Sequence, residues 1–218
     1  MSFRLIKDML AIKLGAQGKP APRGPLGLSL GRAVAIEETP FILIDGAIDI
    51  PHPGGQCVVI GHGTFKVGGV DAHRYYLSGP GGELAGMLQV VERDECRYFR
   101  PFDEVYPASE AEWAFWLDDA DGYIGYPSFE AKGAQYQRVW SPGVGRVAPL
   151  WFEETAVKVD GSRSTAEHTA MLYARELAGA VGPVWEYLLV TAVQAADGTA
   201  WVDLMLGIDL LPSSITAY

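Results

Sequence analysis

Two kinds of hydrophobic periodicity divide the chain. Near the N-terminus, apolar residues recur at spacings of three and four, which predicts an amphipathic helix over residues 3–14 that ends at Gly15. From about residue 33 onward, the apolar positions form short runs separated by glycine, which is typical of antiparallel strands. The chain is therefore expected to be mostly β, with a peripheral helix at its N-terminus.

The expected strands are short, and turn residues separate them. They cover residues 32–36, 41–44, 56–60, 64–67, 74–77, 84–92, 97–99, 155–159, 186–193 and 200–206. Asp197-Gly198 predicts a tight hairpin between the last two strands, and the glycines at 61–63 and 79–82 predict two more hairpin turns. Residues 171–177 fit either a helix or a strand, and both alternatives stay open.

One internal helix is expected over residues 109–118. Ser109 is followed three residues later by Glu112, which is the spacing of a capping box. The expected fold class is α+β, dominated by antiparallel strands, with this internal helix and the peripheral N-terminal one. A second, smaller lobe that begins between about 130 and 150 is an open alternative.

A segment rich in glycine and proline, residues 15–27, follows the N-terminal helix. This composition is typical of an extended linker and places a domain boundary near residue 30. The predicted organisation is an arm with its linker over residues 1–30 and a globular domain over residues 31–218.

Charge is distributed unevenly between these two parts. The chain has a net charge of −10, but residues 1–32 carry +5, which leaves −15 on residues 33–218. So acidic a body repels phosphate backbones and argues against nucleic-acid binding. The basic arm could contact an anionic membrane through residues 1–14, a protein partner, or its own acidic domain. Its predicted contact residues are Phe3, Ile6, Lys7, Leu10 and Lys13.

The same sequence features bound the cellular location. No apolar run approaches the about 18 residues that span a bilayer. Lys7, Asp8 and Lys13 interrupt the apolar stretch that a secretory signal requires. A cytoplasmic protein is therefore expected, and the arm allows a peripheral position at the inner membrane. Cys57 and Cys96 are expected to be reduced and buried.

Three histidines and one cysteine form the strongest candidate for metal chemistry. His52, Cys57, His62 and His73 fall within 22 residues, and imidazole and thiolate are ligands that zinc prefers. Their spacing matches no compact zinc motif, so histidines at turns and sheet edges are the favoured alternative. Without such a site no cofactor is expected.

Adjacent carboxylates occur at several places, including Glu153-Glu154. Neighbouring residues of a strand point to opposite faces, so such pairs are poor acid–base dyads. A solvated surface is the expected location for them.

Several local strings resemble one family. They are residues 104–117 (EVYPASEAEWAFWL), 124–129 (IGYPSF), 138–143 (RVWSPG), 171–175 (MLYAR) and 205–210 (MLGIDL). Together they resemble the YjfK-like family of bacterial proteins of unknown function, over residues 70–212. The resemblance implies a cytoplasmic protein associated with membrane-stress components, and it implies no catalytic residues.

Two functions follow from these observations. The favoured one is a non-catalytic interaction or scaffold protein that binds a protein partner, with oligomerisation left open. The alternative is a metal-dependent hydrolase that uses His52, Cys57, His62 and His73.

Overall fold

One antiparallel sheet accounts for most of the structure. A computed structural model describes residues 24–48, 50–92, 94–178 and 182–218. The strands are β1 Ala33–Ile36, β2 Gln56–Val67, β3 Val70–Ser78, β4 Leu84–Val91, β5 Glu95–Val105, β6 Ser128–Ala131, β7 Ala134–Arg138, β8 Leu150–Lys158, β9 Arg163–Ala178, β10 Pro183–Ala195, β11 Ala200–Leu210 and β12 Ile215–Ala217. The helices are α2 Thr39–Ile44 and α3 Glu110–Leu117, with 3-10 turns η1 Pro25–Gly27 and η2 Pro212–Ser214.

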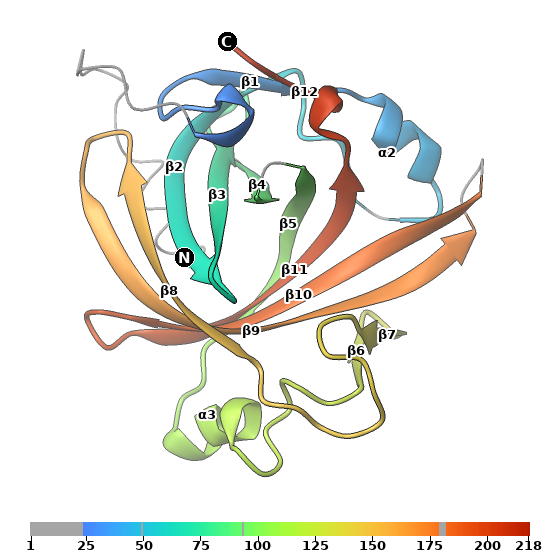
Figure 1. Cartoon of the computed structure of the whole chain (residues 1–218), viewed down its shortest axis with the longest axis vertical. Coiled ribbons are helices and arrows are strands. Elements are labelled where there is room, and N and C mark those ends of the chain that lie inside the picture. Colours follow the sequence, from blue (N-terminus) through green and yellow to red (C-terminus); the bar gives the residue numbers. More distant parts are fainter. Residues whose placement is uncertain (1–23, 49, 93, 179–181) are drawn as a thin grey trace.

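Eight of the strands close into a barrel. From β2 the ring runs through β3, β4, β5, β11, β10, β9 and β8, and β8 returns to β2 through register pairs such as Gly63 with Ala156. Figure 1 shows the long strands β9, β10 and β11 crossing below β2–β5. The antiparallel, mostly β architecture is confirmed. Its closure has no local signal in the sequence, because β2 and β8 lie about ninety residues apart.

The barrel strands bury both of their faces. One cluster of buried side chains comes from all eight barrel strands and from no other element, which places it inside the barrel. The opposite face packs against β1, β12 and α2 in a second cluster. Strands buried on both faces need nearly continuous apolar sequence, as in β10, where eight consecutive residues are buried.

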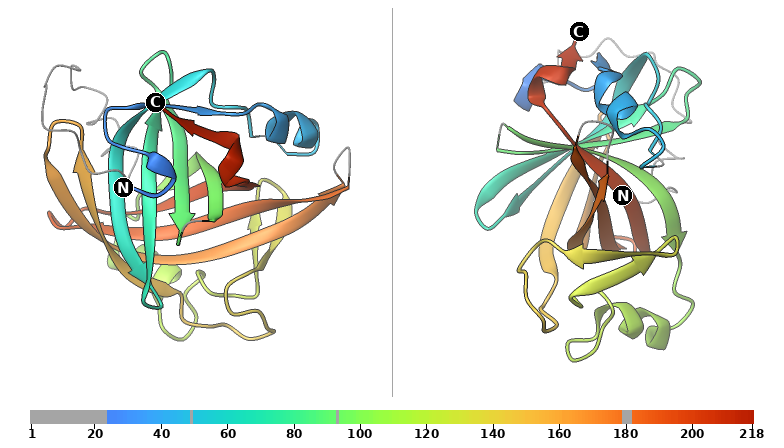
Figure 2. Two further views of the ribbon diagram at one scale, coloured as in Figure 1. Left: turned by 45° about the horizontal axis from the view of Figure 1, so that its top comes forward. Right: turned by 90° about the vertical axis from the view of Figure 1, so that its right-hand side faces the viewer.

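A lobe formed by residues 106–149 lies at one end of the barrel. It contains α3 and the β6–β7 hairpin, and Figure 2 shows it opposite the end that carries β1, β12 and α2. The predicted capping box is confirmed: the Glu112 backbone N–H donates to Ser109 Oγ, and the Glu112 carboxylate accepts from the backbone N–H of Ala108. At the other end of α3, Arg146 donates to the carbonyl oxygens of Asp118 and Asp119.

The predicted strand over residues 41–44 is wrong, because α2 occupies this segment. Pro40 lies in the first turn, where a helix tolerates its missing N–H and favours its fixed φ. Phe41 and Ile44, three residues apart, are buried on one side of the helix, whereas Ile42 is exposed. The apolar run is too short for its periodicity to distinguish the two structures.

The hairpin turn predicted at residues 61–63 is also wrong. β2 runs without interruption from Gln56 to Val67, and a β-bulge shifts its register against β3 between Val59 and Gly61. Glycine is required at position 63 for another reason, because a Cβ atom there would lie 1.8 Å from Glu154 Oε1. Gly63 therefore makes room for a carboxylate inside the barrel.

The remaining predictions are settled by the described residues or fall outside them. Residues 171–177 belong to β9, and the Asp197-Gly198 turn is confirmed, with Gly198 at a φ of 85°. Cys57 and Cys96 are free and buried, as predicted. The helix expected over residues 3–14 lies outside the described residues, so the arm-and-linker division at residue 30 stays a prediction.

Candidate ligand-binding pocket

A network of buried polar side chains occupies the interior of the barrel. Arg74 on β3 donates to Glu154 Oε2 on β8 over 2.8 Å and to Gln89 Oε1 on β4 over 3.0 Å. Tyr76 donates to the other carboxylate oxygen, Glu154 Oε1, over 2.7 Å. Arg74 and Glu154 are only 3% and 2% exposed. Each ion has its charge matched and hydrogen bonds on further atoms, which is the condition under which a buried ion pair is tolerated.

Glu154 corrects the expectation of a solvated Glu153-Glu154 pair. Glu153 is exposed, but the next residue along β8 points to the opposite face and therefore into the barrel. The surrounding inward positions are Phe152 and Ala156, both buried. A charged residue in the inward phase of an apolar strand is the signal that could have identified this site.

His168 extends the network toward one end of the barrel. The imidazole is 1% exposed, stacks on Phe152 with ring centroids 5.0 Å apart, and places Nε2 3.4 Å from Glu154 Oε2. Burial and the charge of Arg74 hold the pKa of His168 well below its usual value, so the ring is neutral. The neighbouring carboxylate favours the proton on Nε2. Nδ1 is then a hydrogen-bond acceptor, and it has no partner among the described residues.

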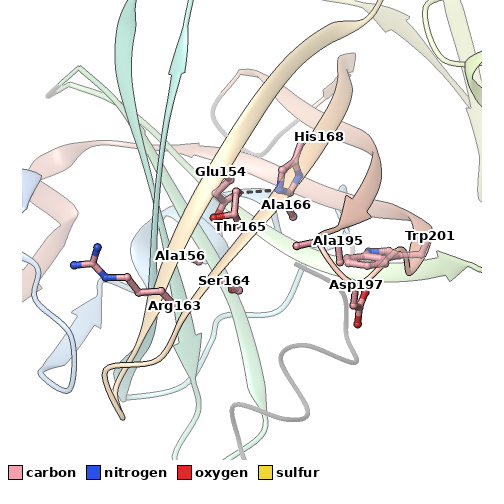
Figure 3. Close-up of a pocket in the computed structure, with 11 residues that line it drawn as sticks. Glu154, Ala156, Arg163, Ser164, Thr165, Ala166, His168, Ala195, Asp197 and Trp201 are labelled. Atoms are coloured by element: carbon pink, nitrogen blue, oxygen red, sulfur yellow. Dashed lines mark ion pairs between the residues drawn. The ribbon is translucent and has the colours of Figure 1, made fainter.

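An open pocket of about 340 Å³ reaches this histidine from the end of the barrel. It lies beside the β8–β9 and β10–β11 hairpins, as Figure 3 shows. Its lining consists of Glu154, Ala156, Arg163, Ser164, Thr165, Ala166, His168, Ala195, Ala196, Asp197 and Trp201. Four small alanines leave space beside the Trp201 ring, and Arg163 and Asp197 lie exposed at the rim.

Two further buried polar atoms lie in the pocket wall without a well-formed hydrogen bond. Ser164 Oγ has no partner among the described residues. Trp201 Nε1 has none of good geometry either, although its N–H lies close enough to Asp203 to favour the carboxylate of that residue. Because buried polar groups in native proteins are nearly always satisfied, three such atoms in one pocket indicate a place for ligand or solvent.

Behind His168 lies a small internal cavity of about 10 Å³. Its lining includes His168, Arg74, Thr191 and Asp203, so the imidazole lies between this cavity and the open pocket. The volume is at the lower limit for one water molecule. Burial, with a smaller contribution from the charge of Glu104, raises the pKa of the Asp203 carboxyl to about 7.

The raised pKa of Asp203 predicts a pH dependence of stability. In the unfolded chain the carboxyl ionises near pH 4, whereas in the folded protein it keeps its proton up to about pH 7. The stability that this proton contributes is complete below about pH 4 and is lost as the pH rises through 7. We expect Asp203→Asn to exceed the wild type in unfolding free energy by about 1–3 kcal/mol at pH 8, and not at pH 4.

Urea denaturation at these two pH values measures the difference. The exposed Asp45→Asn is the control, and it should leave the pH dependence of the wild type unchanged. A stability difference between Asp203→Asn and wild type that is equal at pH 4 and pH 8 would show that Asp203 is not the titrating group.

The predicted metal ligands occupy separate environments. His62 and His73 meet on β2 and β3, with His62 Nε2 3.0 Å from His73 Nδ1. His52 Nε2 instead lies 2.7 Å from the Ile36 carbonyl oxygen, and Cys57 Sγ donates to the Pro53 carbonyl.

The protonation of these groups is also known in part. Burial raises the pKa of the Cys57 thiol to about 11, and burial together with the charge of His73 lowers the pKa of His62 to about 4. Across the described ranges, no group of three or more histidine, cysteine or acidic side chains is arranged to hold a metal ion. The zinc site, and the hydrolase built on it, thus have no support in this geometry.

The other predicted contact residues, Phe3, Ile6, Lys7, Leu10 and Lys13, lie outside the described residues. Among the helices that are described, none is long and apolar enough to cross a membrane. Sequence reasoning missed Arg74, Glu154 and His168, the residues on which the pocket is built. His168 is the one histidine outside the cluster of residues 52–73, and its partner Glu154 lies on the neighbouring strand.

Comparison with known proteins places the chain in a family. A family model described as "Protein of unknown function (DUF2491)" matches residues 9–216. The match extends well beyond residues 70–212, where the resemblance to the YjfK-like family was found, and it does not confirm that name. No curated protein and no solved structure matches the chain. Since the family model covers nearly the whole sequence, the chain belongs to the DUF2491 family of proteins of unknown function.

Proposed function

We propose that this protein binds a small organic molecule in the pocket at the end of its barrel. The observation that carries the proposal is His168, a neutral and almost fully buried side chain at the inner end of an open pocket, with an acceptor atom that lacks a partner. The volume of about 340 Å³ falls within the range of about 300–1,000 Å³ that is usual for small-molecule sites.

Binding is favoured over nucleophilic catalysis by the spacing along β9. Glu154, His168 and Ser164 are the residue types of a catalytic triad. However, Ser164 and His168 are four residues apart on one strand, so their Cα atoms are about 13 Å apart at about 3.3 Å per residue. A nucleophile and its base must lie within hydrogen-bond reach, which this separation prevents.

The pocket can be tested by filling it. Ser164, Ala166 and His168 alternate along β9 and share its inward face, so Ala166 lies between the two polar ends of the pocket. We expect Ala166→Phe to weaken pocket ligands at least about tenfold, because its ring occupies their space. Ligand-observed NMR with a library of neutral, anionic and cationic fragments would compare this variant with the wild type.

The matched control is Glu167→Phe, which adds the same ring to the exposed outer face of the same strand and should leave binding unchanged. Circular dichroism would check that both variants fold. If every fragment that binds the wild type binds Ala166→Phe equally well, the proposed function is wrong.

The expected interaction at a membrane or with a protein partner rests on the N-terminal arm and stays a prediction. If residues 1–14 contact anionic lipid, the full chain should sediment with phosphatidylserine-containing vesicles and a chain lacking residues 1–23 should remain in the supernatant. Neutral phosphatidylcholine vesicles are the control for non-specific sedimentation. Equal sedimentation of the two chains with anionic vesicles would contradict a membrane-binding arm.

A further inference from the structure

Starting from the proposed function, on which this inference rests, we propose that the ligand is uncharged and elongated, and that its inner end donates a hydrogen bond to His168 Nδ1. The requirement for a donor comes from the tautomer of the ring. Nε2 faces the Glu154 carboxylate at 3.4 Å and carries the proton, which leaves a lone pair on Nδ1. A ligand O–H or N–H satisfies this lone pair, whereas an ether or carbonyl oxygen in the same place would leave it unsatisfied.

The preference for an uncharged ligand comes from the charges already matched inside the barrel. Glu154 accepts hydrogen bonds from Tyr76 on one oxygen and from Arg74 on the other. A cation would therefore meet a carboxylate whose charge is already neutralised. An anion would meet a neutral imidazole in place of a free cation. Burying an unpaired ion is costly, so the inner end of the pocket should reject both.

The expected length and shape follow from the walls. Ser164 Oγ and His168 Nδ1 are the two unpartnered polar atoms on β9, and the strand separates their residues by about 13 Å. Between them lie Ala166 and the small side chains of Ala156 and Ala195, with Trp201 as the large aromatic wall. A flat apolar body of about two fused rings fits between a polar inner end and a polar rim.

Four naphthalenes of nearly the same size separate the alternatives. These are 2-naphthol, 2-methoxynaphthalene, 2-naphthoate and 2-naphthylmethylammonium, titrated into the full chain at pH 7 by calorimetry. We expect 2-naphthol to bind at least about tenfold more tightly than the other three compounds, because only it donates without carrying a charge. Ala166→Phe should weaken its binding at least about tenfold, and Glu167→Phe should not.

A second variant tests the acceptor itself. His168→Phe keeps a ring that can stack on Phe152 but removes Nδ1, and it should bring the affinities of 2-naphthol and 2-methoxynaphthalene to within about threefold of each other. If this variant does not fold, the comparison of the four compounds with the wild type decides the question alone.

The outcomes distinguish this inference from the proposed function. If one of the ions or 2-methoxynaphthalene binds as tightly as 2-naphthol and loses affinity in Ala166→Phe, the inference is overturned and the pocket remains a binding site. If Ala166→Phe weakens none of the four compounds, the inference is overturned as well. The fragment library then decides separately whether the pocket binds anything.

Discussion

Replacing Glu154 by alanine is expected to destabilise the folded protein by about 3–5 kcal/mol. The substitution leaves the Arg74 guanidinium buried without its counter-ion and removes the acceptor of the Tyr76 hydroxyl. Phe65 and Phe152 flank the guanidinium at 4.8 and 5.1 Å from their ring centroids, and these contacts cannot replace a carboxylate. Urea denaturation at pH 7 measures the loss.

The neighbouring residue provides a matched control. Glu153→Ala removes the same group from the exposed face of β8 and should change the unfolding free energy by less than about 0.5 kcal/mol. A loss below 1 kcal/mol for Glu154→Ala would mean that water reaches Arg74 when the carboxylate is absent, and the interior network would not be the dry one described above.

Replacing both ions tests the physical reason. Because the cost of Glu154→Ala comes from an unpaired charge, the double variant Arg74→Met with Glu154→Leu removes that charge and should recover most of the lost stability. The arrangement would then be retained for the pocket that it shapes, since it holds His168 neutral and fixes its tautomer. Binding of 2-naphthol to the double variant would show how much the pocket depends on the ion pair.

Replacing Arg138 by methionine is expected to have a comparable effect of about 3–5 kcal/mol. This side chain is 5% exposed and donates to four backbone carbonyls of the lobe. Their oxygens lie at 2.5 Å for Gly125, 2.8 Å for both Ser141 and Gly145, and 3.3 Å for Gly143. Methionine fills part of the volume but donates no hydrogen bond, so the carbonyls lose their common partner.

The loss should be local as well as global. We expect faster hydrogen exchange over residues 122–127 and 139–149, and little change in the barrel strands β9 and β10. Arg163→Met, which removes a guanidinium from an exposed position at the rim of the pocket, is the control and should alter neither region. Unchanged exchange in both loop segments of Arg138→Met would contradict the role of Arg138 in holding the lobe together.

Arg138 also gives a physical meaning to two of the strings on which the family resemblance was based. RVWSPG begins with Arg138 itself, and IGYPSF contains Gly125, whose carbonyl accepts one of its hydrogen bonds. In the sequence these strings are separate fragments without a shared chemistry. The fold brings them together through one guanidinium, a relation that neither string predicts alone.

The capping of α3 shows where sequence reasoning succeeds. Ser109 and Glu112 satisfy the first turn of the helix within four residues, so the interaction is encoded locally and was predicted correctly. The other end depends on Arg146, which reaches the Asp118 and Asp119 carbonyls from 27 or more residues away. It also places a cation where acidic residues alone would oppose the helix dipole.

The sequence by itself determined the strand-rich architecture, the capped helix, the hairpin at Asp197-Gly198 and the uneven distribution of charge. These features depend on residues close together in the chain, where period and turn chemistry are visible. Only the tertiary structure decided that the barrel closes, that Gly63 makes room for Glu154, and that His168 lies neutral at the end of a pocket. Each of these depends on groups from distant strands, and the burial that sets their protonation exists only once those strands have paired.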